Sequence, residues 1–280
     1  MYNIKMKGEC HMEYTALLNE VISLVKKASA IMLRHDFEIT EKGNVVNIVT
    51  SADIAGQNFL EKDLPVLLPG SAFVGEEGNE EAQKAEYLWI VDPIDGTMNF
   101  ARDLGQSGIS VALAHNGEVV LGVVYNPFKD ELFYATAGQG AYCNGEPIKA
   151  TRRPFSEGLF CTAWSLYNKA LAPRCTAVME EVYGLCNDFR RFGVCSLELC
   201  YLAQGKCDLY FEIRLFPWDY AAAGLILREA GGIITGLDGG PAALDRTCPI
   251  IAANSPENHE KLLKIVQKHF PKVPYEEILY

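Results

Sequence analysis

"WIVDPIDGTMNF", residues 89–100, is an apolar run that leads directly into two acidic side chains. Asp92 and Asp95 stand three positions apart with a proline between them, and Gly96 and Thr97 follow at once. A short apolar run is typical of a buried strand, and a carboxylate that is buried without a partner is costly. The stretch therefore predicts a strand whose acidic end needs a compensating group.

The composition limits the classes of function. The chain has 280 residues, of which 49% are hydrophobic, and this is enough for a sizeable core. Its formal net charge of -11 and pI near 5.0 argue against a nucleic-acid or anionic-membrane surface, because an acidic protein repels phosphate groups. We expect small ligands and metal ions as partners, with no nucleic acid and no membrane.

The cysteines and the apolar runs indicate the compartment. Nine cysteines are scattered and never form a CxxC pair: Cys10, Cys143, Cys161, Cys175, Cys186, Cys195, Cys200, Cys207 and Cys248. We expect reduced thiols that pack as small hydrophobic side chains. No apolar run reaches the roughly 20 residues of a membrane span or resembles a signal peptide. The expectation is a soluble, cytoplasmic protein with residues 1–12 as a disordered extension.

The first half of the chain predicts two helices and a set of hairpins. Apolar residues at helical spacing indicate helices over 13–35 and 52–68. The pieces that follow or separate them are rich in β-formers and bounded by turn residues: "VVNIVT" (45–50), "SAFVG" (71–75), "YLWIVD" (87–92), "GISVALAH" (108–115), "EVVLGVVYN" (118–126) and "ELFYATA" (131–137). We expect an antiparallel sheet.

The second half alternates strands with helices. Helices are expected near 174–185, 196–204 and 218–230, and a last helix begins after Ser255, an N-cap followed by Pro256. This alternation predicts a mixed sheet covered by helices, so the fold class is α+β or α/β. No linker separates the halves, and we expect a single domain over 1–280 with a lobe boundary near 150–155.

Four acidic residues lie where strands or helices end: Glu76, Asp92, Asp95 and Asp219. If they converge, their repulsion protonates some of them unless cations hold them ionised. A set of oxygen ligands without histidine favours Mg²⁺ or Mn²⁺ over zinc. Taken singly, each residue has a plainer interpretation: Glu76 as part of a solvated loop, Asp95 and Asp219 as helix N-caps.

Two further segments fit a phosphate ligand. Gly96 and Thr97 form a turn that feeds a helix, whose free N–H groups and positive dipole end hold anions. Asp53 lies in "TSAD", which is equally a capping sequence for the helix that follows.

Together these motifs resemble the inositol monophosphatase family of Mg²⁺-dependent, often lithium-sensitive phosphatases. The resemblance rests on "NIVTSAD" (47–53), "FVGEEG" (73–78), "WIVDPIDGTMNF" (89–100) and "PWDYAAAGLILREAGG" (217–232), and it covers nearly the whole chain. It implies a layered αβαβα sandwich, a homodimer and a Mg²⁺-dependent phosphomonoesterase, a hydrolase that uses two or three metal ions, with Mn²⁺ as an alternative.

The resemblance also implies roles for individual residues. One metal would be held by Glu76, Asp92 and the carbonyl of Ile94, and a second by Asp92, Asp95 and Asp219. A third, weaker metal would lie near Glu76. Thr97 with Asp53 would orient and deprotonate the attacking water, with no phosphoenzyme.

Substrate residues follow from the same resemblance. Glu212 matches a carboxylate that accepts hydrogen bonds from substrate hydroxyls, and Gly193, Val194 and Cys195 match a phosphate- and substrate-binding segment, although Val194 and Cys195 depart from its usual small polar pattern. Lys42 matches a lysine of a mobile loop. Arg214 is either an ordinary surface arginine or a residue that favours a second phosphate on the substrate.

Several substrates and two other classes of protein remain open. Inositol monophosphate is the first expectation, with fructose 1,6-bisphosphate, adenosine 3',5'-bisphosphate and histidinol phosphate as alternatives. A haloacid-dehalogenase-like phosphatase is disfavoured because its aspartates stand two apart. A non-catalytic, metal-stabilised interaction protein is the alternative outside enzymes.

Overall fold

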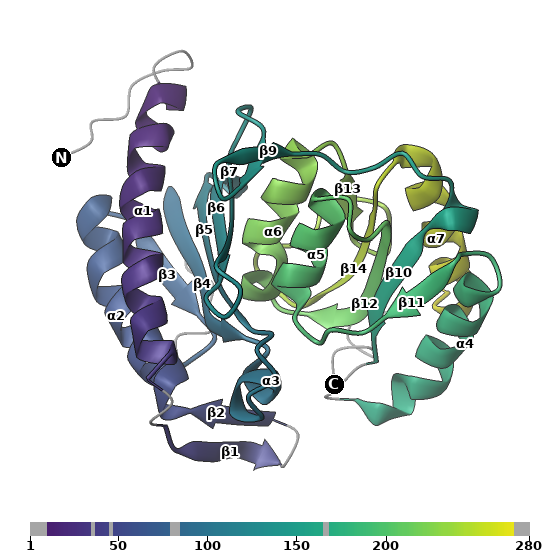
Figure 1. Ribbon diagram of the computed structural model, residues 1–280, viewed down its shortest axis with the longest axis horizontal. Helices are drawn as coiled ribbons and strands as arrows, with labels where there is room; N and C mark the ends of the chain where they lie inside the picture. The colour runs from purple at the N-terminus through teal and green to yellow at the C-terminus, as the bar shows by residue number, and fades with distance from the viewer. Residues whose placement is uncertain (1–9, 35–36, 45–46, 79–84, 165–167, 272–280) are drawn as a thin grey trace.

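The computed structural model describes residues 10–34, 37–44, 47–78, 85–164 and 168–271, and it contains two large β-sheets (Figure 1). The seven-stranded sheet has the order β3-β4-β5-β6-β7-β8-β9 and the five-stranded sheet the order β11-β10-β12-β14-β13. The strands of the first are β3 Ala72–Gly75, β4 Tyr87–Asp95, β5 Gly108–His115, β6 Glu118–Asn126, β7 Glu131–Thr136, β8 Ala141–Cys143 and β9 Glu146–Ile148. Those of the second are β10 Leu159–Ala163, β11 Asp188–Arg190, β12 Leu209–Leu215, β13 Ile233–Thr235 and β14 Cys248–Ala253.

Helices form three layers around these sheets (Figure 1). The outer layer on the seven-stranded sheet is the pair α1 Cys10–Met32 and α2 Ser51–Leu67. The layer between the sheets is α5 Cys195–Ala203 and α6 Pro217–Glu229, and the outer layer on the five-stranded sheet is α4 Ala172–Tyr183 and α7 Pro256–His269. The predicted αβαβα sandwich is confirmed, with a mixed C-terminal sheet. Short elements complete it: α3 Thr97–Ala101 and the 3₁₀ turns Phe155–Glu157 and Lys169–Leu171.

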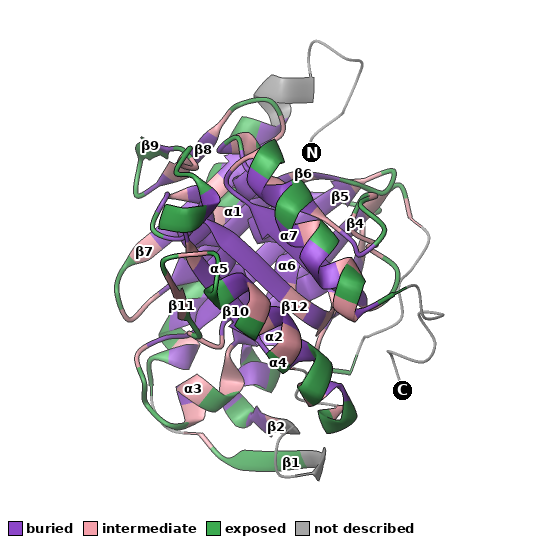
Figure 2. Ribbon diagram, turned by 90° about the vertical axis from the view of Figure 1, so that its right-hand side faces the viewer, coloured by how far each residue is buried: buried purple, intermediate pink, exposed green. Residues whose placement is uncertain are grey.

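Three apolar cores of described residues lie between the layers. Val21 and Val25 of α1 are fully buried in the core that contains Trp89 of β4. The middle core joins both sheets to α5 and α6, and the third packs α4 and α7 on the five-stranded sheet. Figure 2 shows the result: the central strands of the sheets and α6 are buried, whereas the outer helices expose one face. Helical and strand periodicity in the sequence therefore match real buried faces.

The N-terminal sheet departs from the hairpin prediction at one edge. β3 and β4 run parallel, with Val74 opposite Ile90, and parallel neighbours are not joined by a tight hairpin turn. The remaining neighbours in this sheet are antiparallel. The parallel pair places Glu76, just after β3, at the same sheet edge as Asp92.

A second departure concerns "VVNIVT". Its described residues form β2, Asn47–Thr50, which pairs with β1, Ile39–Asn44, in a separate two-stranded sheet. Residues 45 and 46 lie outside the described residues. This small sheet leads directly into α2, where Thr50 is the N-cap.

Helix boundaries agree with the sequence to within three residues. α1 begins at Cys10, three residues before the predicted start, and the rest of the proposed N-terminal extension lies outside the described residues. Ser255 caps α7 and Pro256 is its first residue, as predicted.

The eight cysteines with described side chains are free thiols, and seven of them are buried. Among the described residues, no helix has the length and apolar character needed to span a bilayer.

The two sheets occupy successive parts of the chain and share α5 and α6. β9 ends at Ile148 and β10 begins at Leu159. α6 approaches the first sheet so closely that a Cβ added to Gly122 of β6 would lie 2.7 Å from the Ala222 carbonyl oxygen. Only glycine allows this approach, because both contacting partners are backbone.

Gly122→Ala should therefore destabilise the protein. Overpacking costs about 1–3 kcal/mol, and each kcal/mol lowers the thermal midpoint of a chain of this size by about 2–4 °C. We expect a loss of about 2–12 °C in a thermal unfolding scan. Gly184→Ala is the control, since its nearest atoms are 3.6 Å away. Equal midpoints for the two variants would contradict the close contact.

Candidate active site

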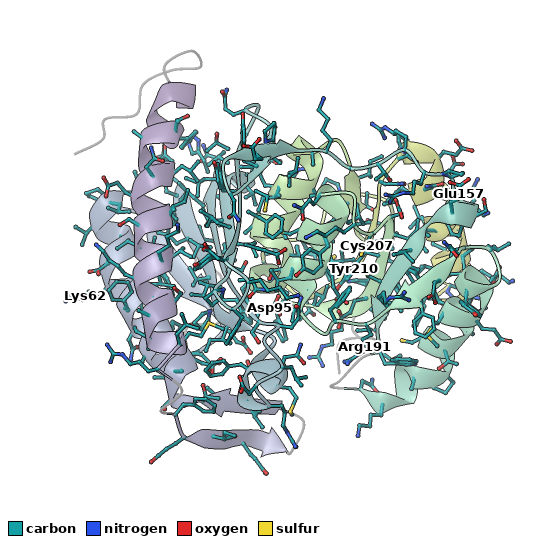
Figure 3. All side chains as sticks on the ribbon, viewed as in Figure 1. Lys62, Asp95, Glu157, Arg191, Cys207 and Tyr210 are labelled. Atoms are coloured by element: carbon teal, nitrogen blue, oxygen red, sulfur yellow. The ribbon has the colours of Figure 1, made fainter. Side chains whose placement is uncertain are left out.

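Segments from both halves of the chain line one cavity of about 310 Å³. This volume is at the lower end of the range for small-molecule sites, about 300–1,000 Å³. The acidic residues Glu76, Asp92, Asp95 and Asp219 all line it. Figure 3 shows Asp95 where β4 ends between the two sheets, with Arg191 on the side of the five-stranded sheet. The strand and helix ends of the two sheets meet at this cavity.

The end of β4 positions two of the carboxylates. Asp92 is 1% exposed and Asp95 is 7% exposed. The pairing of β4 with β5 shifts register between them, since Asp92 is opposite Ser110 and Asp95 is opposite Gly108, and the extra residue of β4 changes the alternation before Asp95. The Ile94 N–H donates to Asp92 Oδ1 at 2.9 Å, which fixes that carboxylate across the turn formed by Pro93.

Backbone donors from the middle helices hold the other carboxylates. The Ser196 N–H, in the first turn of α5, donates to Asp95 Oδ2 at 2.7 Å. The Phe216 N–H, just before α6, donates to Asp219 Oδ2 at 2.8 Å. Asp95 is therefore not the N-cap of α3, which is Gly96, and Asp219 is not an N-cap but the third residue of α6. The backbone N–H groups of Cys195 and Gly96 also interact with Asp95. A carboxylate has about four acceptor sites, so Asp219 keeps acceptor capacity for a ligand.

Burial and mutual repulsion shift the ionisation of these groups. Burial raises the pKa of Asp92 well above its usual range, and the nearby Glu76 and Asp95 raise it further. Burial raises the pKa of Asp95 to about 6, although the hydrogen bonds from Ser196 oppose the shift. Burial and the neighbouring Asp95 also raise the pKa of Asp219. These carboxylates are costly to keep ionised without a cation.

The carboxylate oxygens of the cavity are the kind of ligand that a hard divalent cation prefers. Their arrangement is a separate question. Among the described residues, no three histidine, cysteine or acidic side chains stand in an arrangement that could hold a metal ion. Oxygen donors without histidine are nevertheless the set that Mg²⁺ or Mn²⁺ prefers.

A hydrogen-bonded chain connects the cavity to the start of α2. Thr97 lines the cavity, and its Oγ1 lies 3.2 Å from Asp53 Oδ1 and 3.1 Å from the Ile94 carbonyl oxygen. Thr50 donates its N–H to Asp53 Oδ2 at 2.8 Å and its hydroxyl to the same oxygen at 2.5 Å. Asp53 is fully buried, and burial raises its pKa to about 6. Asp53 thus caps α2 and contacts Thr97 at the same time.

A glycine turn follows the second aspartate. Gly96 has φ of 84°, the left-handed region that favours glycine, and its carbonyl accepts from Ser107 Oγ at 3.1 Å. α3 begins at Thr97, and its first intrahelical bond runs from the Phe100 N–H to the Gly96 carbonyl at 3.0 Å. The N–H groups that precede this bond have no acceptor within the helix, and that of Gly96 interacts with the Asp95 carboxylate. Gly96 and Thr97 both line the cavity.

The opposite wall contains most of the predicted substrate residues. Gly193, Cys195 and Glu212 line the cavity. Burial raises the pKa of Glu212 to about 7, and Tyr210 Oη donates to Glu212 Oε2 at 2.8 Å. Val194, which was expected in this wall, is not among the residues that line the cavity.

Val194 packs behind the glycine turn instead. Its side chain is fully buried, and its Cγ2 would lie 2.7 Å from a Cβ added at Gly96. Lys42 belongs to β1, but its side chain lies outside the described residues.

Sequence reasoning missed two groups of residues at this site. Asn99 lines the cavity and donates Nδ2 to the carbonyl oxygens of Gln106, at 3.0 Å, and Phe192, at 2.7 Å. Tyr210 and Thr50 each hold an acidic side chain of the site in place. Asn99 acts on partners remote in the chain, Thr50 is already explained by capping, and Tyr210 acts on Glu212 from the same strand, where nothing in an apolar β-strand pattern distinguishes it.

Comparison with known proteins gives a family model and close relatives. The model described as the inositol monophosphatase family matches residues 11–270. The Nus factor SuhB of Escherichia coli (strain K12) is 34% identical over 231 residues, 80% of this chain and 86% of that protein. An inositol-1-monophosphatase of Rhizobium meliloti (strain 1021) is 34% identical over 268 residues, 93% of this chain and 99% of that protein.

Solved structures share the fold. An IMPase of Thermotoga maritima has a TM-score of 0.81 and 31% identity, with 93% of this chain and 98% of that chain covered. An IMPase/NADP phosphatase complexed with Mg²⁺ and phosphate has a TM-score of 0.78 and 25% identity, with 88% of this chain and 93% of that chain covered.

The raised pKa of Asp95 predicts a pH-dependent stability. Its pKa is about 6 in the fold against an ordinary 3.8, so the folded protein binds more protons between these values. The contribution of Asp95 to the free energy of unfolding of the metal-free protein therefore falls by about 3 kcal/mol as pH rises through this window. Asp95→Asn should raise the thermal midpoint at pH 7.5 and have little effect at pH 4.

The control is Asp245→Asn, which removes an exposed carboxylate paired with Arg246. MgCl₂, against NaCl of matched ionic strength, should raise the midpoint of the wild type and of the control at pH 7.5, and raise that of Asp95→Asn much less. Parallel pH profiles for wild type and Asp95→Asn would contradict the assigned burial of charge.

Proposed function

The chain belongs to the inositol monophosphatase family, and we propose that it is a Mg²⁺-dependent phosphomonoesterase that acts on a small polyol or sugar phosphate. The observation that carries the proposal is the convergence of Asp92, Asp95 and Asp219 on one cavity beside the Thr97–Asp53 pair. Acidic residues from separate segments meet a hydroxyl and a buried carboxylate there, which is the set that water activation and phosphate binding require.

The proposed metal ligands are Glu76, Asp92, Asp95 and Asp219, with the carbonyl oxygen of Ile94. A relative of this fold was solved with Mg²⁺ and phosphate, which supports the choice of ion. When bound, such ions lower the pKa of water and neutralise charge on the phosphate oxygens. Their positive charge would also restore ordinary acidity to the buried carboxylates, whose pKa values are raised by burial and repulsion.

Thr97 and Asp53 are proposed to handle the proton of the attacking water. The Thr97 hydroxyl has one proton, which it donates toward Asp53 or Ile94, and its lone pairs accept from the water. Asp53 has a pKa of about 6, which suits proton uptake near neutral pH. Thr50 holds the second Asp53 oxygen, so the pair keeps one orientation.

The remaining wall is proposed to bind the ester. The N–H groups around Gly96 and Thr97 suit the phosphate oxygens, because the first turn of a helix offers donors to anions. Glu212 is proposed to accept hydrogen bonds from substrate hydroxyls, with Gly193 and Cys195 beside it. Inositol monophosphate is the reference substrate, and a homodimer, a cytoplasmic location, two or three metal ions and sensitivity to lithium are further parts of the proposal.

A second candidate follows from the names of relatives. Several are called Nus factor SuhB, among them that of Escherichia coli (strain K12). In a protein with only a binding role, the acidic residues of the cavity would not need to be arranged for catalysis. Phosphate release from inositol 1-phosphate with Mg²⁺, measured against EDTA, separates the two: activity supports the phosphatase, and none from any small phosphate ester supports the binding role.

Asp95→Asn should lower kcat/KM for that reaction by more than about a hundredfold, because metal activation supplies several kcal/mol of transition-state stabilisation. The substitution keeps the shape of the side chain and an acceptor for the Ser196 N–H. Asp245→Asn should stay within about twofold of wild type. Retention of more than about a tenth of the wild-type rate in Asp95→Asn, at saturating Mg²⁺, would count against the assigned ligands.

Thr97→Val should lower kcat by about a hundredfold or more, since positioned proton transfer contributes about 10²–10⁴. Mg²⁺ binding, read from the shift of the thermal midpoint, should change little, because the hydroxyl is proposed to hold water. Thr97→Ser is the control that returns the hydroxyl and should recover most of the rate. Equal losses of rate and of Mg²⁺ binding would make Thr97 a structural residue.

A further inference from the structure

One wall of the cavity includes a short segment without regular secondary structure. Residues 191–194 connect β11 to α5, and Arg191 and Gly193 of this segment line the cavity beside Glu212 and Arg214 of β12. Gly193 has φ of 75°, in the left-handed region that favours glycine. A segment outside helices and strands has no regular ladder of backbone hydrogen bonds, so other groups must hold it in place.

Two side chains from different elements hold this segment at Phe192. Asn99 of α3 donates Nδ2 to the Phe192 carbonyl oxygen at 2.7 Å, and the Phe192 N–H donates to Glu198 Oε1 at 2.8 Å. Glu198 is the fourth residue of α5, and its side chain reaches back past the N-cap Val194, whose own side chain makes no capping bond. Both backbone polar groups of Phe192 are therefore paired, and the residues on either side of it line the cavity.

Glu198 is an acidic residue inside the middle layer of helices. It is 1% exposed, and its neighbours in the helix, Leu197 and Leu199, are fully buried. Its Oε2 has no hydrogen-bond partner among the described residues. Burial raises the pKa of Glu198 well above its usual range, the Phe192 N–H opposes this shift, and Glu212 adds to it. Glu198 is therefore a neutral acid at neutral pH, with its Oε1 paired to the Phe192 N–H.

The carboxyl group of Glu198 supplies something that an apolar side chain of the same size lacks. A methionine would occupy this place without the cost of burying a polar group. It would leave the Phe192 N–H without its acceptor, which is unfavourable where water has little access. The segment would then move until that N–H met water or another acceptor, and Arg191 and Gly193 would move with it.

We propose that Glu198 is a positioning residue, which holds the segment 191–193 so that this wall of the cavity fits the alcohol part of the substrate. The inference rests on the proposed function, in which Glu212 and the residues beside it bind substrate hydroxyls. Glu198 is not among the described residues that line the cavity, so it acts through Phe192. The proposed metal ligands and Thr97 lie on other elements, so the effect falls on substrate binding.

The test compares Glu198→Gln with Glu198→Met in the full-length protein with Mg²⁺. Glutamine is neutral, has nearly the same shape and keeps an acceptor oxygen for the Phe192 N–H, whereas methionine removes that acceptor. Two substrates are used: inositol 1-phosphate, and p-nitrophenyl phosphate, whose leaving group has no hydroxyl.

We expect Glu198→Met to lower the ratio of kcat/KM for inositol 1-phosphate to that for p-nitrophenyl phosphate by about tenfold. The change should arise from the KM of inositol 1-phosphate, because a loss of binding that is common to the ground state and the transition state leaves kcat unchanged. Glu198→Gln should keep the ratio within about twofold of wild type, since it keeps the acceptor.

Two further measurements separate positioning from a general loss of stability. Val182→Ala shortens a fully buried side chain of α4 in the core against the five-stranded sheet, and it should lower the thermal midpoint without changing the ratio. Amide hydrogen exchange of the Phe192 segment, followed by mass spectrometry, should be faster in Glu198→Met than in wild type or Glu198→Gln. If Glu198→Met does not fold, Asn99→Ala, which removes the other side-chain bond to Phe192, replaces it in both measurements.

The outcomes distinguish this inference from the proposed function. An unchanged ratio in Glu198→Met, an equal change of the ratio in Val182→Ala, or a Glu198→Gln variant that behaves like Glu198→Met would overturn the positioning role. Each of these results requires hydrolysis by wild type, so the proposed function would stand. No phosphate release by wild type from either ester would overturn the proposed function, and the role of Glu198 with it.

Discussion

Burial of several carboxylates at one place is the constraint on which this structure depends. Asp92 and Asp95 lie almost out of contact with solvent, and their repulsion with Glu76 raises the cost of keeping them ionised. The fold meets part of this cost with backbone N–H donors from different segments, including those of Ser196 and Phe216. Because the Ser196 donor belongs to the start of α5 and Asp95 to the end of β4, this hydrogen bond also ties α5 to the seven-stranded sheet.

The topology of the first sheet serves the same end. In an antiparallel hairpin the ends of β3 and β4 would point in opposite directions, and Glu76 would lie far from Asp92. The parallel pairing of these strands brings both residues to one edge. α6 then supplies Asp219 from the other side, and its approach to the sheet is possible because β6 has a glycine, Gly122, opposite its backbone. The close packing of α6 on the sheet therefore also decides where the Asp219 carboxylate lies.

The sequence predicts what depends on local chemistry. Helical periodicity, the Ser255 cap and the alternation of elements in the second half identify the helices and the layered class, because each signal comes from neighbouring residues. The parallel β3–β4 pair was not predictable in this way, since pairing depends on the path of the chain in space. Val194 was expected in the binding wall and packs behind it, because the sequence does not reveal which side of a turn faces the cavity. Asn99 was missed because it acts on two remote carbonyl oxygens.

The capping and functional interpretations of the acidic residues prove compatible. Asp53 accepts from Thr50 as the third residue of α2, and its other oxygen lies within hydrogen-bond distance of Thr97. Asp219 accepts from the Phe216 N–H as the third residue of α6 and lines the cavity as well. A carboxylate has two oxygens, so a helix start can hold one while the other faces a ligand. Capping is therefore the means by which a flexible acidic side chain is held in a defined position, and the same local pattern in a sequence supports both interpretations until the fold shows what the second oxygen meets.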